Sequence, residues 1–301
     1  MENEKNYILP ATLLISAIMV ASALLYEKNP KPNDSFSVAT NSIVGEKKLT
    51  VLEEIILPPR GVFLPVRWGD LGAKLVSVGA IDRERFKALY DERGEFNDEY
   101  ARLLTGTSNG QLRISKKNAG YLLNLFWALG LASKNPVLEN GEMNNQAYGG
   151  AGNLASTGGW NLAVGNSMEH YSRHKFFELT DEQQAMVEKV SSGIYRPCCN
   201  NPTHFPDCNH GMAMLGLLEL MASQGANEKE MWQTALAVNS YWFPNNYLTI
   251  ATYMQDNGVK WDDVKPEEIL GLDYSSASGF QQIASQVNQT RQQGGGGGCS
   301  V

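Results

Sequence analysis

The sequence predicts a mainly α-helical fold: an irregular helical domain with a long glycine-rich loop, behind an N-terminal transmembrane helix. Three observations predict it. An uncharged run of 20 residues lies near the N-terminus, helix caps recur from Asp70 onward, and glycines gather in residues 144–167. The apolar fraction of 43% is ordinary for a folded protein. The formal charge of −7, without a basic stripe, argues against a nucleic-acid partner.

The uncharged run is residues 7–26, YILPATLLISAIMVASALLY. As a helix it is long enough to cross roughly 30 Å of hydrocarbon. A secretory signal cut after Ala21-Ser22-Ala23 is the alternative, but the run is long for a signal and the segment before it is more acidic than basic. We therefore expect residues 1–26 to be a membrane anchor, or an uncleaved signal, with the membrane as a partner through residues 7–26.

The segments on either side of the anchor specify its orientation only weakly. Lys5 precedes the run, whereas Lys28 and Lys31 follow it. A large downstream domain translocates largely regardless of such charges. We expect a single-pass membrane protein whose main domain is extracytoplasmic.

The rest of the chain divides into three predicted parts. Residues 27–48 are rich in Pro, Ser and Asn, as is typical of a flexible stalk. Residues 49–291 are predicted to form a predominantly α-helical domain, and residues 292–301 a disordered glycine-rich tail that ends in the thiol of Cys299. Within the domain, three prolines between residues 49 and 68 favour extended segments over a helix.

Each expected helix has a start signal, an apolar period or a stop signal. Thr180 with Gln183, and Asn227 with Glu230, have the spacing of a capping box. In chain order the helices are expected at about 70–79, 82–94, 116–130, 180–193, 209–225, 227–243, 247–258, from 266, and 275–291.

A glycine-rich segment interrupts this pattern. Residues 144–167 hold six glycines in 24 positions and predict a long irregular loop. The segment has neither G-x-G-x-x-G nor G-K-[ST], so no motif supports a nucleotide site. A structural loop with positive φ at several glycines is the simpler interpretation, although long loops are often functional.

His170 and His174 are the first half of a cluster of reactive side chains. Four residues apart on a helix, both imidazoles face the same direction, which is the spacing that two ligands of one metal ion need. Tyr171 occupies the position of the glutamate in H-E-x-x-H, so metalloprotease chemistry is not supported. The common alternative is a solvated helix face.

The second half is the turn-rich stretch 195–210. It holds five further candidate ligands within thirteen residues: Cys198, Cys199, His204, Cys208 and His210. Zinc and copper accept such mixtures of thiolate and imidazole. All four histidines and three of the four cysteines lie within 41 positions, which chance explains poorly. The spacing nevertheless matches neither a four-cysteine nor a Cys₂His₂ zinc module.

Two other chemistries remain open for these cysteines. Outside the cytoplasm, Cys208 can pair with Cys198 or Cys199 in a disulfide that stabilises the loop by roughly 2–4 kcal/mol. Cys208 also precedes a helix expected to begin near Asn209, where a lowered thiol pKa would aid redox chemistry and metal ligation alike. Cys299, on its flexible tail, is a further thiol that could exchange with the site.

Two functions follow from these observations. The first is a membrane-anchored metal-binding protein that holds zinc or copper through the His/Cys cluster, as a metal-dependent enzyme or as a protein that transfers metal ions or thiols. The second is a non-enzymatic envelope protein with a structural disulfide loop and a helical surface that binds another envelope protein. The sequence specifies no small-molecule substrate and no catalytic residue.

Overall fold

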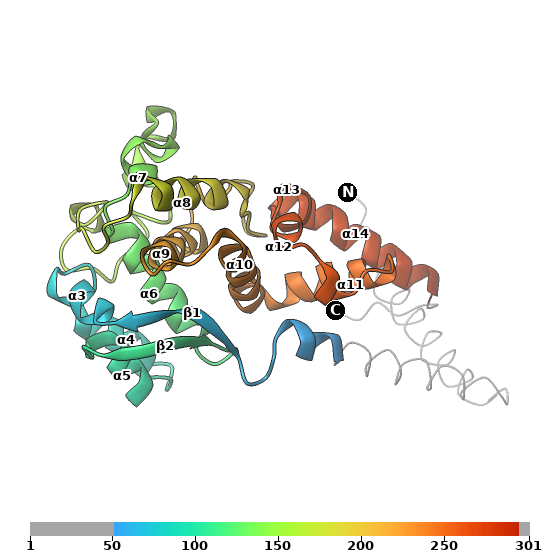
Figure 1. Ribbon diagram of the computed structural model, residues 1–301, viewed down its shortest axis with the longest axis horizontal. Coiled ribbons are helices and arrows are strands. Elements are labelled where there is room, and N and C mark those ends of the chain that lie inside the picture. Colours follow the sequence, from blue (N-terminus) through green and yellow to red (C-terminus); the bar gives the residue numbers. More distant parts are fainter. Residues whose placement is uncertain (1–50, 295–301) are drawn as a thin grey trace, which may run out of the picture. The chain divides into compact units, whose positions relative to one another are not determined.

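The computed structural model describes residues 51–294 (Figure 1). The expected anchor (1–26), the stalk (27–48) and Cys299 lie outside the described residues. No helix within residues 51–294 has the length and hydropathy needed to cross a membrane.

The described chain is mainly helical, which confirms this part of the predicted fold class. Residues 51–56 are helical. The further elements, in chain order, are β1 (Val62–Gly69), α3 (Leu71–Ser77), α4 (Arg83–Asp91), α5 (Asp98–Thr105), β2 (Asn109–Ile114), α6 (Ala119–Ala132), α7 (Pro136–Asn140), the 3₁₀ turns η1 (Glu142–Asn144), η2 (Gln146–Tyr148), η3 (Ala151–Asn153) and η4 (Ser167–Glu169), then α8 (Asp181–Gly193), α9 (Asn209–Ser223), α10 (Glu228–Trp242), α11 (Pro244–Asp256), η5 (Trp261–Asp263), α12 (Pro266–Ile269), α13 (Leu272–Ser275) and α14 (Ala277–Gly294).

The helix starts follow the short-range signals of the sequence. Both capping boxes form: the Thr180 hydroxyl accepts from the Gln183 amide at the start of α8, and Asn227 does the same for Glu230 at α10. The residues expected to share one apolar face of α6, among them Leu122 and Phe126, are fully buried. Residues 144–167 form irregular backbone that contains the 3₁₀ turns η2 and η3 and overlaps η1 and η4 at its two ends, as the glycine content predicts.

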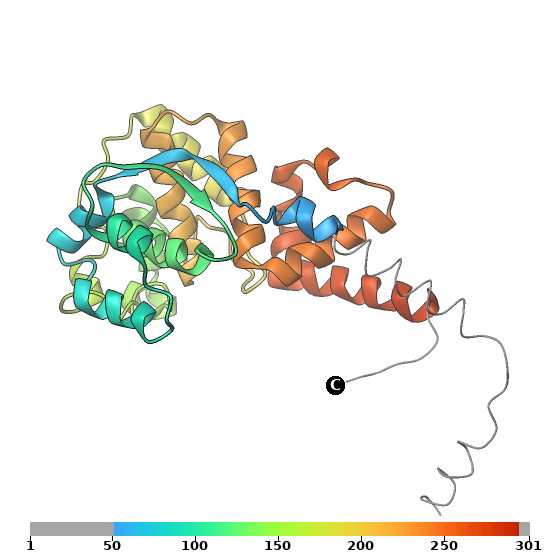
Figure 2. The ribbon, with the colours of Figure 1, turned by 90° about the horizontal axis from the view of Figure 1, so that it is seen from below.

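The two strands were foreseen only in part. β1 pairs antiparallel with β2, from Val62 opposite Ile114 to Gly69 opposite Asn109, and the two strands run together along one side of the helices (Figure 2). Extended backbone was expected over residues 49–68, but residues 51–56 are helical, and β2 was not predicted. β2 is short and depends on pairing with a strand about 45 residues away, a contact that no local pattern encodes.

Two glycines let α6 and α9 cross at the centre of the domain. A Cβ on Gly130 would lie 2.0 Å from the Met212 carbonyl oxygen, and one on Gly216 would lie 2.6 Å from the Gly130 nitrogen. The two backbones therefore touch where both side chains are missing. This crossing fixes α9, whose first turn carries the candidate metal centre.

We expect Gly216→Ala to destabilise the protein by about 1–3 kcal/mol, because the new methyl group forces the two helices apart. Gly120→Ala on α6 is the matched control, since its Cβ meets nothing within 4 Å. That change should be neutral or stabilising by up to about 1 kcal/mol. Urea denaturation of both variants measures the difference, and equal stabilities would contradict the close crossing.

Candidate metal centre

Residues 194–208, here called the cysteine loop, connect α8 to α9 without regular secondary structure. Backbone hydrogen bonds hold the loop to its surroundings. The His204 amide donates to the Ser191 carbonyl on α8 (3.0 Å), and the Ala277 amide at the start of α14 donates to the Cys199 carbonyl (2.9 Å). The Asn200 side chain also accepts from the amide of Ser278 at 2.9 Å. Hydrogen bonds to α8 and to the start of α14 thus hold the cysteine loop in place.

The loop brings three thiols into mutual contact. The Sγ atoms of Cys198, Cys199 and Cys208, here called the thiol triad, lie 3.6–3.8 Å apart in all three pairs. A disulfide requires about 2.05 Å, and all three cysteines are free. The disulfide considered from the sequence is therefore not formed among these three residues.

Cys208 is the N-cap of α9, one residue earlier than the expected cap at Asn209. Its Sγ accepts from the backbone N–H of Gly211 at 3.5 Å and from Nη2 of Arg196 at 3.4 Å. Hydrogen bonds from Cys198, Cys199 and His210, together with the Arg196 charge, lower the pKa of Cys208 far more than burial raises it. The thiolate expected at this helix end is therefore favoured.

The pKa values of the other two thiols are raised rather than lowered. Hydrogen bonding to Cys199 and Cys208, and then burial, raise the pKa of Cys198. The hydrogen bond with Cys198 lowers the pKa of Cys199, but the bond to Cys208 and burial outweigh it and raise that pKa to about 11. Hydrogen bonding within the triad therefore favours the thiolate at Cys208 and the protonated thiol at Cys198 and Cys199.

Arg196 lies beneath the triad and has no solvent exposure. Its Nη2 pairs with an Asp207 carboxylate oxygen at 2.8 Å, and its Nη1 donates to the Asn201 carbonyl at 2.9 Å. The guanidinium rests against Gly211, where a Cβ would come within 2.7 Å of it. Burial lowers the pKa of Arg196, but electrostatic interactions with Cys208, Cys199 and Asp207 and the hydrogen bond to Cys208 raise it, so the guanidinium stays charged.

His210 stands beside the triad in the first turn of α9. Its ligand nitrogen and the sulfurs of Cys198 and Cys208 lie within 4.8 Å of one another. Among the described residues its Nδ1 is buried and has no hydrogen-bond partner. The ring packs against Phe243, with centroids 4.3 Å apart. A buried nitrogen without a partner is costly unless something binds it.

A second group, Cys199, Asp207 and Cys208, also has its ligand atoms within 4.8 Å. The two groups overlap at Cys208 and form one cluster of three sulfurs, one imidazole and one carboxylate. These five residues lie close enough together to hold a metal ion. Because Asp207 is already paired with Arg196, the sulfurs and the imidazole are the ligands available for it.

His170 and His174 do not join this cluster, since neither belongs to either group. They are not on one helix, as the sequence suggested: His170 ends the 3₁₀ turn η4, and His174 forms an isolated parallel bridge with Ser133. Their ring nitrogens, His170 Nδ1 and His174 Nε2, still meet at 3.2 Å. Burial, His170 and Arg173 lower the pKa of His174, which favours its neutral form.

A strained turn brings these two histidines together. Ser172 lies between them at φ +50° and is the one non-glycine residue with positive φ in the described chain. Its amide donates to the Leu131 carbonyl at 2.9 Å, and its hydroxyl accepts from the Asn135 amide at 3.1 Å. These contacts to the end of α6 offset a backbone conformation that L residues rarely adopt.

His204 is the last of the seven candidate ligands. It lies in the cysteine loop, and its backbone amide bonds to Ser191, but its side chain belongs to neither ligand group. The structure thus brings Cys198, Cys199, Cys208 and His210 together and leaves His170, His174 and His204 outside.

The glycine-rich loop borders the cysteine loop at two points. The Ser156 amide donates to the Asp207 carbonyl at 3.1 Å, and the rings of Tyr148 and Phe205 lie 5.2 Å apart. The glycine-rich loop (residues 144–167) therefore packs against the cysteine loop.

Sequence reasoning missed two buried ionisable residues, Arg196 and Glu219. Arg196 was not recognised as the cation beneath the cysteines, although it stands two positions before them. Glu219 is the only acidic or basic residue in the apolar stretch of α9, and this isolation is a signal of a buried ionisable side chain. It is 1% exposed, and the Ser133 hydroxyl donates to it at 2.5 Å.

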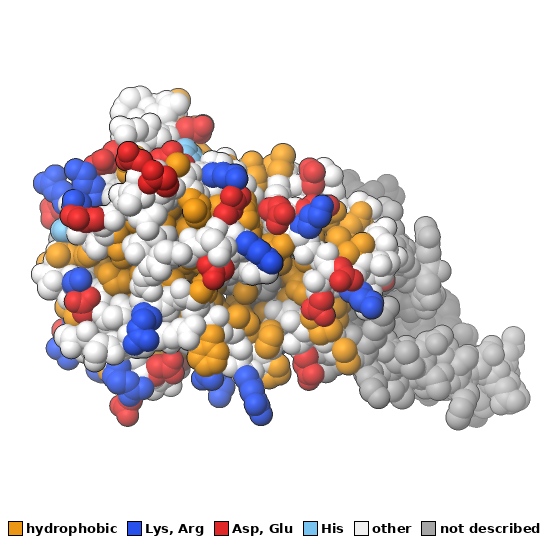
Figure 3. Space-filling model, viewed as in Figure 1, with side chains coloured by type: hydrophobic (Ala, Val, Ile, Leu, Met, Phe, Trp, Pro, Cys, Tyr) orange, Lys and Arg blue, Asp and Glu red, His pale blue; other side chains and the backbone are white. Residues whose placement is uncertain are grey.

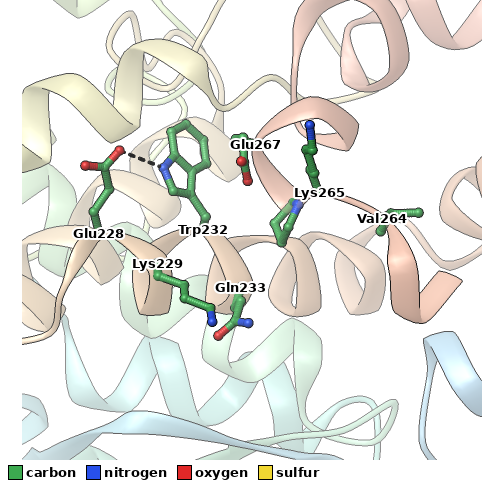
Figure 4. A pocket seen from close by; sticks show the side chains of 8 residues that line it. Glu228, Lys229, Trp232, Gln233, Val264, Lys265 and Glu267 are labelled. Carbon is green, nitrogen blue, oxygen red and sulfur yellow. Dashed lines mark hydrogen bonds between the residues drawn. The ribbon is translucent and has the colours of Figure 1, made fainter.

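A pocket of about 650 Å³ lies elsewhere, between α10 and the segment that leads into α12 (Figure 4). Two lysines, two glutamates, Trp232, Gln233, Val264 and Pro266 line it, and the indole N–H of Trp232 donates to Glu228 at 3.3 Å. None of the candidate ligands lines this pocket. Acidic and basic side chains are interspersed over the face in Figure 3, which shows no extensive area of one sign.

Comparison of the chain with protein-family models, with curated proteins and with solved structures found no match. The geometry of the cysteine loop is therefore the basis on which a function is assigned.

Proposed function

We propose that this protein binds one transition-metal ion, zinc or copper, through Cys198, Cys199, Cys208 and His210. The spacing of the thiol triad carries the proposal. Sulfur ligands about 2.3 Å from a tetrahedral zinc ion lie about 3.8 Å apart, because a tetrahedron's edge is about 1.6 times its centre-to-corner distance. The three observed separations are 3.6–3.8 Å.

His210 is the natural fourth ligand, because its imidazole offers a ligand nitrogen within 4.8 Å of the sulfurs of Cys198 and Cys208. A tetrahedral Cys₃His site suits Zn²⁺. Cu⁺ favours soft thiolates, so the three sulfurs alone would serve it. Arg196 offsets part of the negative charge that three thiolates bring. The ligand set favours either ion over magnesium or calcium, which prefer oxygen.

The metal ion is better suited to transfer to an acceptor ligand than to stabilising the fold. The Arg196–Asp207 ion pair and the backbone hydrogen bonds of the cysteine loop hold the ligands in place by themselves. Cys198 is exposed, so an acceptor ligand can reach the site from solvent. These features support a role in binding and transferring the ion.

The cellular setting is part of the proposal. The uncharged run 7–26 supports a single-pass anchor, with the metal-binding domain outside the cytoplasm and a protein partner in the envelope. Fractionation of cells that express the full chain, with protease added to intact cells, tests this arrangement. Recovery of the intact chain in the soluble cytoplasmic fraction would contradict it.

Elemental analysis of the full chain, purified without a histidine tag and reconstituted with zinc, should find about one equivalent. We expect Cys208→Ser to weaken zinc binding at least about 100-fold, because it removes the sulfur shared by both ligand groups. His204→Ala and His174→Ala are matched controls that should keep the full equivalent. His210→Ala should weaken zinc binding but leave Cu⁺ binding nearly unchanged.

Less than about a tenth of an equivalent of either ion after reconstitution would refute the metal function. The alternative function, an envelope protein with a structural disulfide loop, would then be favoured if thiol counting found no free thiols in the cysteine loop. The free thiols in the structure favour the metal function.

A further inference from the structure

The thiol triad is asymmetric in its access to solvent. Cys198 is exposed, whereas Cys199 and Cys208 are half-buried. The Sγ of Cys198 also lies 3.6 Å from that of Cys208, the shortest of the three separations. An exposed thiol with a second thiol in contact has the arrangement required for two-step thiol–disulfide exchange.

We propose that the thiol triad reduces low-molecular-weight disulfides by thiol–disulfide exchange, and that this oxidation releases the bound metal ion. The release rests on the proposed metal function. The exchange does not, because it needs only the three thiols.

The reaction has two balanced steps. In the metal-free triad the Cys198 proton passes to the Cys208 thiolate 3.6 Å away, and Cys198 attacks one sulfur of the disulfide R–S–S–R, which forms the mixed disulfide Cys198–S–S–R and expels one R–S⁻. The expelled R–S⁻ takes the proton from Cys208, whose thiolate then attacks the Cys198 sulfur, forms the Cys198–Cys208 disulfide and expels the second R–S⁻. One disulfide bond forms in the protein and one is broken in R–S–S–R, which is reduced to R–SH and R–S⁻, and a bound metal ion keeps its oxidation state.

Geometry selects Cys208 over Cys199 as the resolving thiol. Consecutive Cα atoms across a trans peptide are about 3.8 Å apart, below the usual disulfide range of about 4.4–6.8 Å, so a bond between Cys198 and Cys199 is strained. Cys199 is also held on both sides, since its amide donates to the Arg196 carbonyl at 3.2 Å and its carbonyl accepts from Ala277 at 2.9 Å. The sulfurs of Cys198 and Cys208 need only approach each other by about 1.6 Å.

Oxidation removes two of the four proposed ligands at once. Cys199 and His210 remain, and two ligands bind zinc far more weakly than four. The exposed edge of the triad thus serves both as the point of attack by the disulfide and as the exit for the ion.

The test uses the full chain with Cys299→Ser, so that only triad thiols are counted. Reduced protein, both metal-free and zinc-loaded, is incubated with excess oxidised glutathione, and its free thiols are then alkylated. Peptide mass spectrometry should find a Cys198–Cys208 disulfide with Cys199 alkylated. In the zinc-loaded sample, a chromogenic chelator should detect release of the ion in step with the disulfide.

Two variants isolate the steps. Cys199→Ser should still form the internal disulfide, whereas Cys208→Ser should accumulate the mixed disulfide of Cys198 with glutathione. Three alkylated thiols in the unsubstituted triad, or a Cys198–Cys199 bond, would overturn the exchange. A disulfide that forms while zinc stays bound would overturn the release. Oxidation of a protein that never took up zinc or copper would support the exchange and overturn the proposed metal function and the release with it.

Discussion

Replacing Arg196 with methionine is expected to destabilise the protein by about 3–5 kcal/mol. The substitution keeps the apolar stem of the side chain but removes the guanidinium and its charge from a position with no solvent exposure. It leaves Asp207 without its partner at 2.8 Å and the Asn201 carbonyl without its donor. Removing one member of a buried ion pair costs about this much, and we expect the lower end of the range here because the Asp207 side chain is 21% exposed and keeps a hydrogen bond from the Asn201 side-chain amide at 2.8 Å.

Lys189→Met is the matched control, since Lys189 pairs with Glu228 at 2.8 Å with both side chains exposed. Such surface pairs contribute about 0–1 kcal/mol. Urea denaturation of the two variants should give clearly different midpoints at similar slopes. A loss of less than about 1 kcal/mol for Arg196→Met would show that the guanidinium does not hold the cysteine loop.

The same variant has a second readout at the thiol triad. Arg196 is one of the groups that lower the pKa of Cys208. Without it, alkylation of Cys208 by iodoacetamide should require a higher pH, because the thiolate is the reacting form. An unchanged pH profile of alkylation would mean that the neighbouring thiols alone stabilise the thiolate.

Glu219 is expected to make the protein less stable as the pH rises from about 4.5 to 8. Burial raises the pKa of this carboxyl from 4.5 to about 8, and the hydrogen bond from Ser133 lowers it only in part. The folded protein therefore holds a proton that the unfolded chain has lost. The stabilisation is complete below the unfolded pKa and declines by roughly 1.4 kcal/mol per pH unit until the folded pKa is reached.

Glu219→Gln should remove this dependence, because the amide keeps an acceptor for Ser133 and cannot ionise. The variant should match the natural protein near pH 4.5 and exceed its stability by several kcal/mol near pH 8. Urea denaturation between pH 5 and pH 8.5 measures the difference curve, in which the other carboxyl groups cancel. Parallel curves for the two proteins would contradict a buried, protonated Glu219.

Short-range patterns determined most of the helices. Thr180 with Gln183, and Asn227 with Glu230, act within one turn, so the sequence alone locates the starts of α8 and α10. The buried face of α6 also follows from a period of 3.6 residues. The candidate ligands that meet at the cysteine loop are also close in sequence, since they lie between residues 198 and 210.

The tertiary structure decided which candidate ligands meet. Ser172 adopts positive φ only because contacts to the end of α6 offset the strain, and this turn pairs His170 with His174 away from the thiol triad. The burial of Arg196 depends on the close fit against Gly211. These features arise from contacts between distant or irregular segments, for which the sequence has no local signal. The sequence by itself determined the mainly helical fold and the cluster of candidate ligands, while packing selected three cysteines and one histidine from that cluster.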